Sequence, residues 1–98
     1  RIDPDDLLKA YTLGYFPMAK TRFDEHVLWV MPEARGVLPL GEARAPKRLL
    51  RTLMAEPFEV TIDTAFSEVI AACAKTTKSR EDTWINHAVE DVFVALHA

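Results

Sequence analysis

The sequence contains a single cysteine, Cys73, which excludes an internal disulfide and any zinc site built from several cysteines. Three histidines are present, but His26, His87 and His97 do not share the spacing of metal ligands. With only three glycines, the chain has no glycine-rich phosphate loop, and it has no nucleophile elbow. We therefore expect no metal site and assign no catalytic residue within these 98 residues.

Long apolar stretches are also missing, since the longest run is the six residues from Val69 to Ala74. A membrane-spanning helix needs about 20 apolar residues, so we expect no membrane segment. The chain starts without methionine or an apolar signal segment, and its last residues fall inside a predicted helix. We therefore expect part of a longer protein. The single cysteine also suits a reducing, cytoplasmic setting.

Charge of one sign does not dominate, because 12 lysines and arginines face 15 acidic residues, for a net charge of −3. That balance argues mildly against a nucleic-acid binder, but the cations are unevenly placed. A helix predicted from Pro46 to about Ala55 brings four of them to roughly a third of its circumference: Arg44, Lys47, Arg48 and Arg51. The pattern alone favours a solvated face of an ordinary amphipathic helix, and the alternative is a face that contacts phosphates.

Three further helices are predicted from capping residues and apolar spacing. Asp3 caps the first, which ends at Gly14. Asp63 or Thr64 caps the second, and Asn86 caps the third. The second helix carries an apolar stripe at i, i+3, i+4 and i+7, so Cys73 on that stripe is predicted to be a core residue.

The strands are predicted from apolar runs and turn residues. Apolar arms at 27–31 and 37–40 flank Pro32 to Gly36, which predicts a hairpin with Trp29 in the core. Residues 58–62 alternate and predict a strand with one buried face. Tyr15 to Met18 is predicted to be extended because of its proline, and it could form either core packing or the wall of an apolar pocket.

These elements predict an α+β fold in two parts. The composition changes near Glu56 and Pro57. Residues 1–56 are predicted to form a small N-terminal α/β domain with a hairpin, and residues 57–98 the beginning of another domain.

Trp84 is the residue most suggestive of binding. It lies between a charged loop and a capped helix, where a core tryptophan is less expected. Aromatic side chains on loops often stack on bases or on other planar groups.

Several short motifs occur together in a characteristic order. They are Leu8 to Tyr11, Gly14 to Met18, Leu28-Trp29, Pro32 to Pro39, Phe58 to Thr61 and Thr83-Trp84-Ile85. Together they resemble the leucyl/phenylalanyl-tRNA–protein transferases, the bacterial enzymes of the N-degron pathway. The match runs through nearly the whole chain.

The resemblance implies a reaction, a fold and partners. Such enzymes transfer leucine or phenylalanine from aminoacyl-tRNA to an N-terminal arginine or lysine of an acceptor protein, which marks that protein for degradation. They need no metal or diffusible cofactor, because the aminoacyl ester carries the energy. A small N-terminal domain precedes an N-acyltransferase-like (acetyltransferase-like) domain, and we expect the full-length protein to be a monomer.

The resemblance also assigns residues by position. Trp84 is similar to the tryptophan that contacts the 3′-terminal adenosine of the aminoacyl-tRNA, and Phe16 and Met18 belong to the same site. Some members have a second tryptophan where this chain has Met18. The segment from Arg44 to Arg51 resembles the basic segment that faces the tRNA acceptor stem, so the phosphate interpretation is now preferred.

The family's acid, amide and side-chain pocket residues lie beyond Ala98. We therefore expect these residues alone to be catalytically incomplete. The alternatives are a non-catalytic module that binds tRNA, another RNA or a protein, and an inactive remnant.

Overall fold

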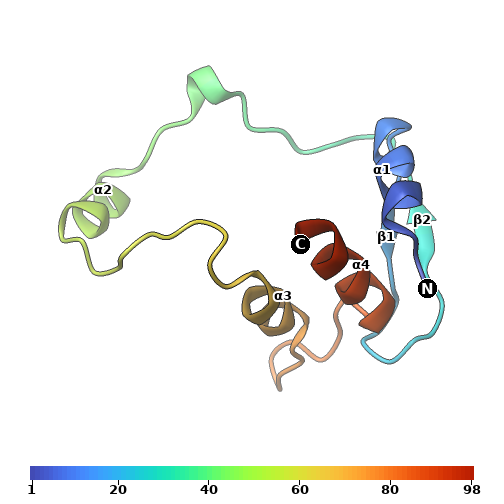
Figure 1. Cartoon of the computed structure of the whole chain (residues 1–98). Coiled ribbons are helices and arrows are strands. Elements are labelled where there is room, and N and C mark those ends of the chain that lie inside the picture. The colour runs from blue at the N-terminus through green and yellow to red at the C-terminus, as the bar shows by residue number, and fades with distance from the viewer. The chain divides into compact units, whose positions relative to one another are not determined.

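The computed structural model describes residues 1–98 and has an α+β fold, as predicted. Figure 1 shows the elements in chain order. They are α1 (Pro4–Thr12), β1 (Phe16–Met18), β2 (Leu28–Val30), the 3-10 helix η1 (Leu40–Glu42), α2 (Lys47–Met54), α3 (Phe66–Ala74) and α4 (His87–His97).

The chain forms two compact units. The first unit consists of residues 1–32 and 65–98 and contains α1, β1, β2, α3 and α4. The second unit consists of residues 33–64 and contains η1 and α2. The chain thus leaves the first unit after β2 and re-enters it just before α3 (Figure 1).

Helix α1 begins and ends as its sequence predicts. The Asp3 carboxylate accepts a hydrogen bond from the Asp5 N–H at 2.8 Å, which caps the first turn. At the other end, Gly14 has a φ of 90°, and the Tyr15 N–H donates to the Ala10 carbonyl at 2.9 Å. This is a Schellman ending, which requires a left-handed residue and so favours glycine.

The only sheet is a two-stranded antiparallel hairpin of β1 and β2, in which Pro17 lies opposite Trp29. The hairpin predicted within 27–40 is therefore wrong, because Leu28–Val30 pairs with the preceding segment and residues 37–40 form no strand. Packing decided the partner: the Pro17 side chain is fully buried, whereas the apolar side chains of 37–40 stay exposed. Pro17 is tolerated because each strand of a two-stranded sheet has a free edge.

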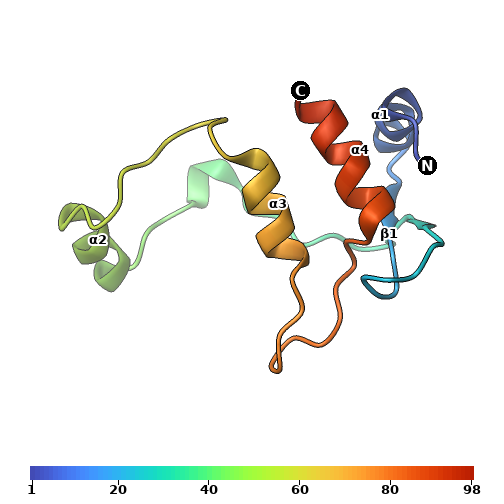
Figure 2. The ribbon, with the colours of Figure 1, turned by 60° about the horizontal axis from the view of Figure 1, so that its bottom comes forward.

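The core of the first unit lies between α3 and α4. Ile70 and Ala74 from α3 pack with Ile85 and Val89, and all four are buried. Helix α1 contacts both α4 and β1, so the hairpin and the helices form one body. Figure 2 shows α3 and α4 side by side within it.

The caps of α3 and α4 differ. Asn86 caps α4 as predicted, since its side-chain oxygen accepts from the Val89 N–H at 2.9 Å. The predicted cap of α3 by Asp63 or Thr64 is wrong: the N-cap is Ala65, which has no side-chain cap. Packing of Phe66 and Ile70 on the core holds α3 in place of a polar cap.

The second unit contains α2, which matches the predicted helix to within one residue at each end. None of the residues of η1 or α2 is buried. The strand predicted at 58–62 is not formed, and Phe58, Val60 and Ile62 are exposed. Alternating apolar residues form a strand only where a neighbouring strand bonds their backbone, and this unit contains no strand to pair with.

Two predicted core residues lie at the surface. Trp29 is 42% exposed on β2, so its assignment to the core is wrong. Cys73 is also exposed, because the buried face of α3 runs through Ile70 and Ala74 and not through Cys73. The helix predicted from the apolar stripe is confirmed, but its packed face is rotated away from Cys73.

Candidate functional site

The segment that precedes α4 holds Trp84 with its indole ring partly exposed. Trp84 is 45% exposed, whereas Thr83, Ile85 and Asn86 are buried. The Ile85 N–H donates to the Thr83 hydroxyl oxygen at 3.2 Å, which fixes the main chain across Trp84. The neighbours of Trp84 therefore hold the backbone while its indole ring stays available for contact.

The end of β1 lies directly beside Trp84. The Ala19 N–H donates to the Trp84 carbonyl oxygen at 2.8 Å, and Ala19 is buried. Met18 and Trp84 consequently line the same cavity of about 440 Å³. Its other lining residues include Lys20, Leu28, Cys73, Arg80, Asp82 and Thr83. The walls are mainly apolar and the charged groups come from Lys20, Arg80 and Asp82.

A second cavity, of about 430 Å³, is lined by Trp84 and by Ile85, the residue that follows it. It lies against α3 and α4, with Phe66, Val69 and Phe93 among its lining residues. Cys73, Arg80 and Trp84 line both cavities. Trp84 thus contributes to two adjoining hollows of the first unit.

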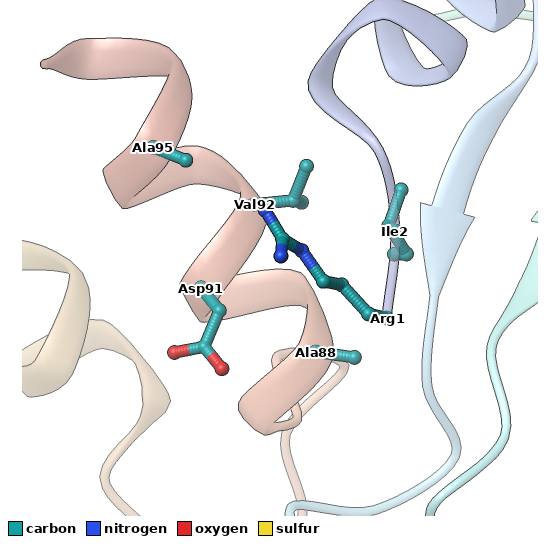
Figure 3. A pocket seen from close by; sticks show the side chains of 6 residues that line it. All are labelled: Arg1, Ile2, Ala88, Asp91, Val92 and Ala95. Carbon is teal, nitrogen blue, oxygen red and sulfur yellow. The ribbon is translucent and has the colours of Figure 1, made fainter.

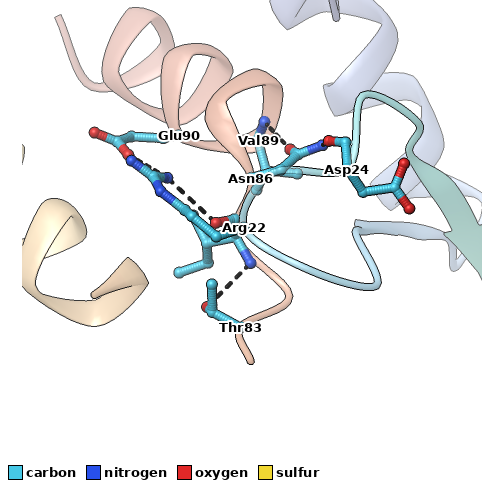
Figure 4. Close-up of polar contacts among 7 residues, drawn as sticks. Arg22, Asp24, Thr83, Asn86, Val89 and Glu90 are labelled. Carbon is cyan, nitrogen blue, oxygen red and sulfur yellow. Dashed lines mark hydrogen bonds and ion pairs between the residues drawn. The ribbon is translucent and has the colours of Figure 1, made fainter. Parts of the chain in front are cut away.

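Polar contacts from the β1–β2 loop hold the segment that carries Trp84 (Figure 4). Arg22 Nη1 lies 2.7 Å from Glu90 Oε2 and donates to the Ile85 carbonyl at 3.2 Å. The contact with Glu90 is an ion pair and not an aligned hydrogen bond. Asn86 Nδ2 donates to the Asp24 carbonyl at 2.9 Å, so the loop is joined to the start of α4 at two places.

The turn after α3 is closed by Arg80. The Thr77 N–H donates to the Arg80 carbonyl at 2.7 Å, and the Arg80 N–H donates back at 3.1 Å. Arg80 Nη2 donates to the carbonyls of Ala72 and Lys75, which lie in the last turn and at the C-cap of α3. The side chain satisfies carbonyls that the helix leaves unpaired.

The predicted binding residues are partly brought together. Met18 and Trp84 meet at one cavity, whereas Phe16 is half-buried on β1 and does not line it. Lys47, Arg48 and Arg51 lie on α2 in the second unit and are exposed. Arg44 precedes α2, so the helical spacing expected for it does not apply.

Sequence reasoning missed Arg22, Arg80 and Glu90, which looked like ordinary loop and helix charges. Their partners are main-chain carbonyls or a residue more than 60 positions away. A main-chain or distant partner of this kind leaves no periodic signal in the sequence. In the sequence, Arg22 and Arg80 are distinguished only as arginines within polar loops.

Another cavity, of about 480 Å³, lies between the N-terminal residues and α4. Figure 3 shows the Arg1 side chain extending across it towards Val92. The other lining residues are Ile2, Ala88, Asp91 and Ala95. It has no aromatic lining residue, so it lacks the stacking surface that Trp84 gives the other cavity.

Three further observations concern the titration of Tyr11, metal binding and the character of the helices. Tyr11 is partly buried, and this desolvation raises the pKa of its hydroxyl above the usual value. No group of three or more histidine, cysteine or acidic side chains is arranged to hold a metal ion. None of the helices has the length and apolar character that crossing a membrane requires.

Comparison with known families decides the relationship. The family model described as leucyl/phenylalanyl-tRNA protein transferase matches residues 37–98, and the model of that family's N-terminal domain matches residues 1–33. The chain belongs to this transferase family. The resemblance predicted from the motifs is thereby confirmed.

Individual relatives agree with the family assignment. The leucyl/phenylalanyl-tRNA–protein transferase of Rhizorhabdus wittichii is 50% identical over 96 residues, which is 98% of this chain and 39% of that protein. The protein of the same name from Nitrobacter winogradskyi is 47% identical over 98% of this chain and 43% of that protein. The one from Caulobacter vibrioides is 50% identical over 96% of this chain and 43% of its own length.

The chain thus spans about two fifths of the length of the curated relatives it matches. No solved structure matches it.

Proposed function

We propose that this chain is part of an aminoacyltransferase that moves leucine or phenylalanine from aminoacyl-tRNA to an N-terminal arginine or lysine of acceptor proteins. The cavity shared by Met18 and Trp84, in a chain of this family, is the observation that carries the proposal. Transfer marks the acceptor for degradation, and the enzyme works in the cytoplasm.

Trp84 and Met18 receive the 3′-terminal adenosine, and Phe16 supports that site from β1. An indole stacks on any base, and a thioether packs favourably against aromatic rings. The partial exposure of Trp84 and Met18 supports this role, since a buried side chain could not reach a nucleotide.

The cationic residues before and on α2 contact the acceptor stem of the tRNA. Lys47, Arg48 and Arg51 lie within roughly 100° of one another around the helix, and Arg44 lies just before it. Exposed arginine and lysine side chains on one face can follow a phosphate backbone.

The reaction makes limited demands on the protein. An amine attacks an aminoacyl ester, so both partners must be positioned, a proton must leave the ammonium group and the oxyanion must be stabilised. Residues 1–98 supply the positioning of the tRNA end. The ester carries the energy of peptide-bond formation, so no cofactor is required.

The architecture is proposed on the same basis. Residues 1–56 form the small N-terminal domain, and residues 57–98 begin an N-acyltransferase-like domain that the rest of the monomeric protein completes. The boundary near Glu56 and Pro57 remains a prediction.

The test is transfer of radiolabelled leucine from leucyl-tRNA to a peptide that begins with arginine, using the intact protein. We expect label in peptides that begin with arginine or lysine, and none in a matched peptide that begins with alanine or has an acetylated N-terminus. Absence of transfer by a folded, intact protein overturns the proposal.

A second candidate function is a non-catalytic module that binds tRNA, another RNA or a protein. The exposed cations on α2 favour it. Tight tRNA binding by residues 1–98 with no transfer by any longer form supports this alternative.

A further inference from the structure

Two cationic side chains line the cavity that Met18 and Trp84 share, and the proposed function gives neither of them a role. Lys20 follows β1, and Arg80 closes the turn after α3. Asp82 is the one carboxylate among the lining residues, so the two cations exceed it by one charge. The cavity therefore combines an aromatic wall with an excess of positive charge.

Arg80 is held in place while part of its guanidinium group stays available. Nη2 donates to the carbonyls of Ala72 and Lys75, whereas Nε and Nη1 make no hydrogen bond within the chain. A planar guanidinium fixed at one nitrogen keeps its other donors in a set direction. Such a group loses little conformational freedom when it binds a second partner.

Lys20 is exposed and forms no hydrogen bond or ion pair with the rest of the chain. Its main chain is nevertheless held, because the preceding residue, Ala19, is buried and bonded to Trp84. The ammonium group can therefore reach over the cavity from a fixed base. A lysine and a pre-oriented arginine together suit a phosphate group, since both side chains are common phosphate ligands.

We propose that Lys20 and Arg80 form a phosphate-binding subsite beside Trp84, which takes the phosphodiester group next to the 3′-terminal nucleotide of the tRNA. The inference rests on the proposed function, because a base on Trp84 brings its own 5′-phosphate to the rim of the same cavity. The subsite fixes the direction in which the strand enters. It thereby favours a polynucleotide end over a free aminoacyl nucleoside.

Two non-hydrolysable ligands test the subsite in the intact protein. One is adenosine that carries leucine through a 3′-amide and has no phosphate, and the other is the same group at the end of a CCA trinucleotide. Lys20→Ala and Arg80→Ala should each weaken binding of the trinucleotide by roughly 3- to 10-fold and leave binding of the nucleoside unchanged. Lys78→Ala is the matched control, since Lys78 lies in the same turn but does not line the cavity.

The two ligands separate a phosphate contact from a positioning role. If Arg80 acts only by holding the turn that leads to Trp84, Arg80→Ala weakens both ligands equally, and the proposal is overturned. Lys20→Ala leaves the Arg80 contacts intact, so it keeps the test decisive if Arg80→Ala does not fold. Unchanged trinucleotide binding by Lys20→Ala also overturns the proposed pair.

Salt gives an independent measurement. The affinity for the trinucleotide should fall as salt rises, and both variants should flatten that dependence, as loss of a phosphate contact requires. Parallel slopes in the variants and the unaltered protein contradict the subsite. If the unaltered protein binds neither ligand, the proposed function fails and the subsite fails with it. If replacing Trp84 weakens binding but replacing Lys20 or Arg80 does not, only the subsite is overturned.

Discussion

The Ala19 N–H and the Trp84 carbonyl oxygen are joined by a hydrogen bond of 2.8 Å. This bond connects the residue after β1 to the residue two positions before Asn86, the cap of α4, across most of the chain. Because Met18 is the neighbour of Ala19, the bond also places the methionine thioether at the cavity that Trp84 lines. This main-chain contact between distant segments brings together the two sides of the proposed site for the tRNA end.

Replacing Trp84 should reduce binding of charged tRNA. Stacking of a base on an aromatic side chain contributes about 1–3 kcal/mol, so Trp84→Ala should raise the Kd roughly 5- to 150-fold. The Kd of Trp84→Phe should lie between those of the unaltered protein and Trp84→Ala, since phenylalanine keeps a smaller ring. The measurement is equilibrium binding of a tRNA that carries leucine through an amide.

Trp29 provides the matched control. It is 42% exposed, close to the 45% of Trp84, but it lies on β2 and lines neither cavity of Trp84. Trp29→Ala should leave the Kd within about twofold, because it removes no stacking surface. Equal losses in the two variants would show that the effect is general destabilisation.

Met18 should tune the same site. Met18→Trp adds a second aromatic ring to the cavity that Trp84 lines, and we expect it to tighten binding of the leucyl-adenosine amide several-fold. Met18→Ala should loosen it by a few-fold, because the thioether contact is lost. Calorimetric titration of both variants measures these affinities. If both variants bind as tightly as the unaltered protein, Met18 does not contact the nucleotide.

The cations of α2 should control the salt dependence of tRNA binding. Changing Lys47, Arg48 and Arg51 together to glutamine removes up to three phosphate contacts. The slope of log K against log salt should then become shallower by about 2–3 units. Binding of tRNA over a series of salt concentrations measures that slope.

A charge-matched control comes from lysines outside α2. Lys9, Lys75 and Lys78 lie in the first unit, and changing these three to glutamine alters the net charge by the same amount. We expect their salt slope to match that of the unaltered protein within about half a unit. If the two triple variants flatten the slope equally, net charge accounts for binding and α2 has no special role.

Local signals in the sequence predicted local structure well. The Asp3 cap, the Gly14 ending and the Asn86 cap all appear where expected, because each depends on residues within a few positions. The hairpin within 27–40 was wrong for a related reason. Pro32 to Gly36 does contain turn residues, but the partner of Leu28–Val30 was chosen by burial of Pro17, which no local pattern encodes.

The candidate site was predictable only in part. Trp84 could be singled out by its polar surroundings, and its partial exposure agrees with that expectation. The approach of Met18 could not be derived from the residues, since it depends on the bond between Ala19 and Trp84. Arg22 and Arg80 both donate to main-chain carbonyls, which are identical in every sequence, so these bonds leave no trace in it.

Tyr11 should give the stability a specific alkaline dependence. Partial burial raises the pKa of its hydroxyl in the folded chain above 10.0, so the unfolded chain releases this proton first. The free energy of unfolding should therefore fall as the pH rises through and above 10.0. Tyr11→Phe should remove part of that fall, as urea unfolding at pH 8 to 11 would show, and identical curves for the two proteins would contradict the assignment.

Asn86 should be the most costly polar residue to lose. Its oxygen caps α4 by accepting from Val89, and its nitrogen donates to the Asp24 and His26 carbonyls, so truncation leaves three main-chain groups without their partner. Loss of an N-cap costs about 0.5–2 kcal/mol, and unpaired buried groups add to this, so Asn86→Ala should lower the free energy of unfolding by about 2–3 kcal/mol.

Asn86→Asp separates the two contributions. An aspartate keeps the acceptor at the start of α4 but loses the donor to the loop. We therefore expect the free energy of unfolding of Asn86→Asp to lie between those of the unaltered protein and Asn86→Ala. Urea unfolding of the three proteins under one set of conditions gives the order. If Asn86→Asp is as stable as the unaltered protein, the bonds to Asp24 and His26 contribute nothing, and the cap alone accounts for the role of Asn86.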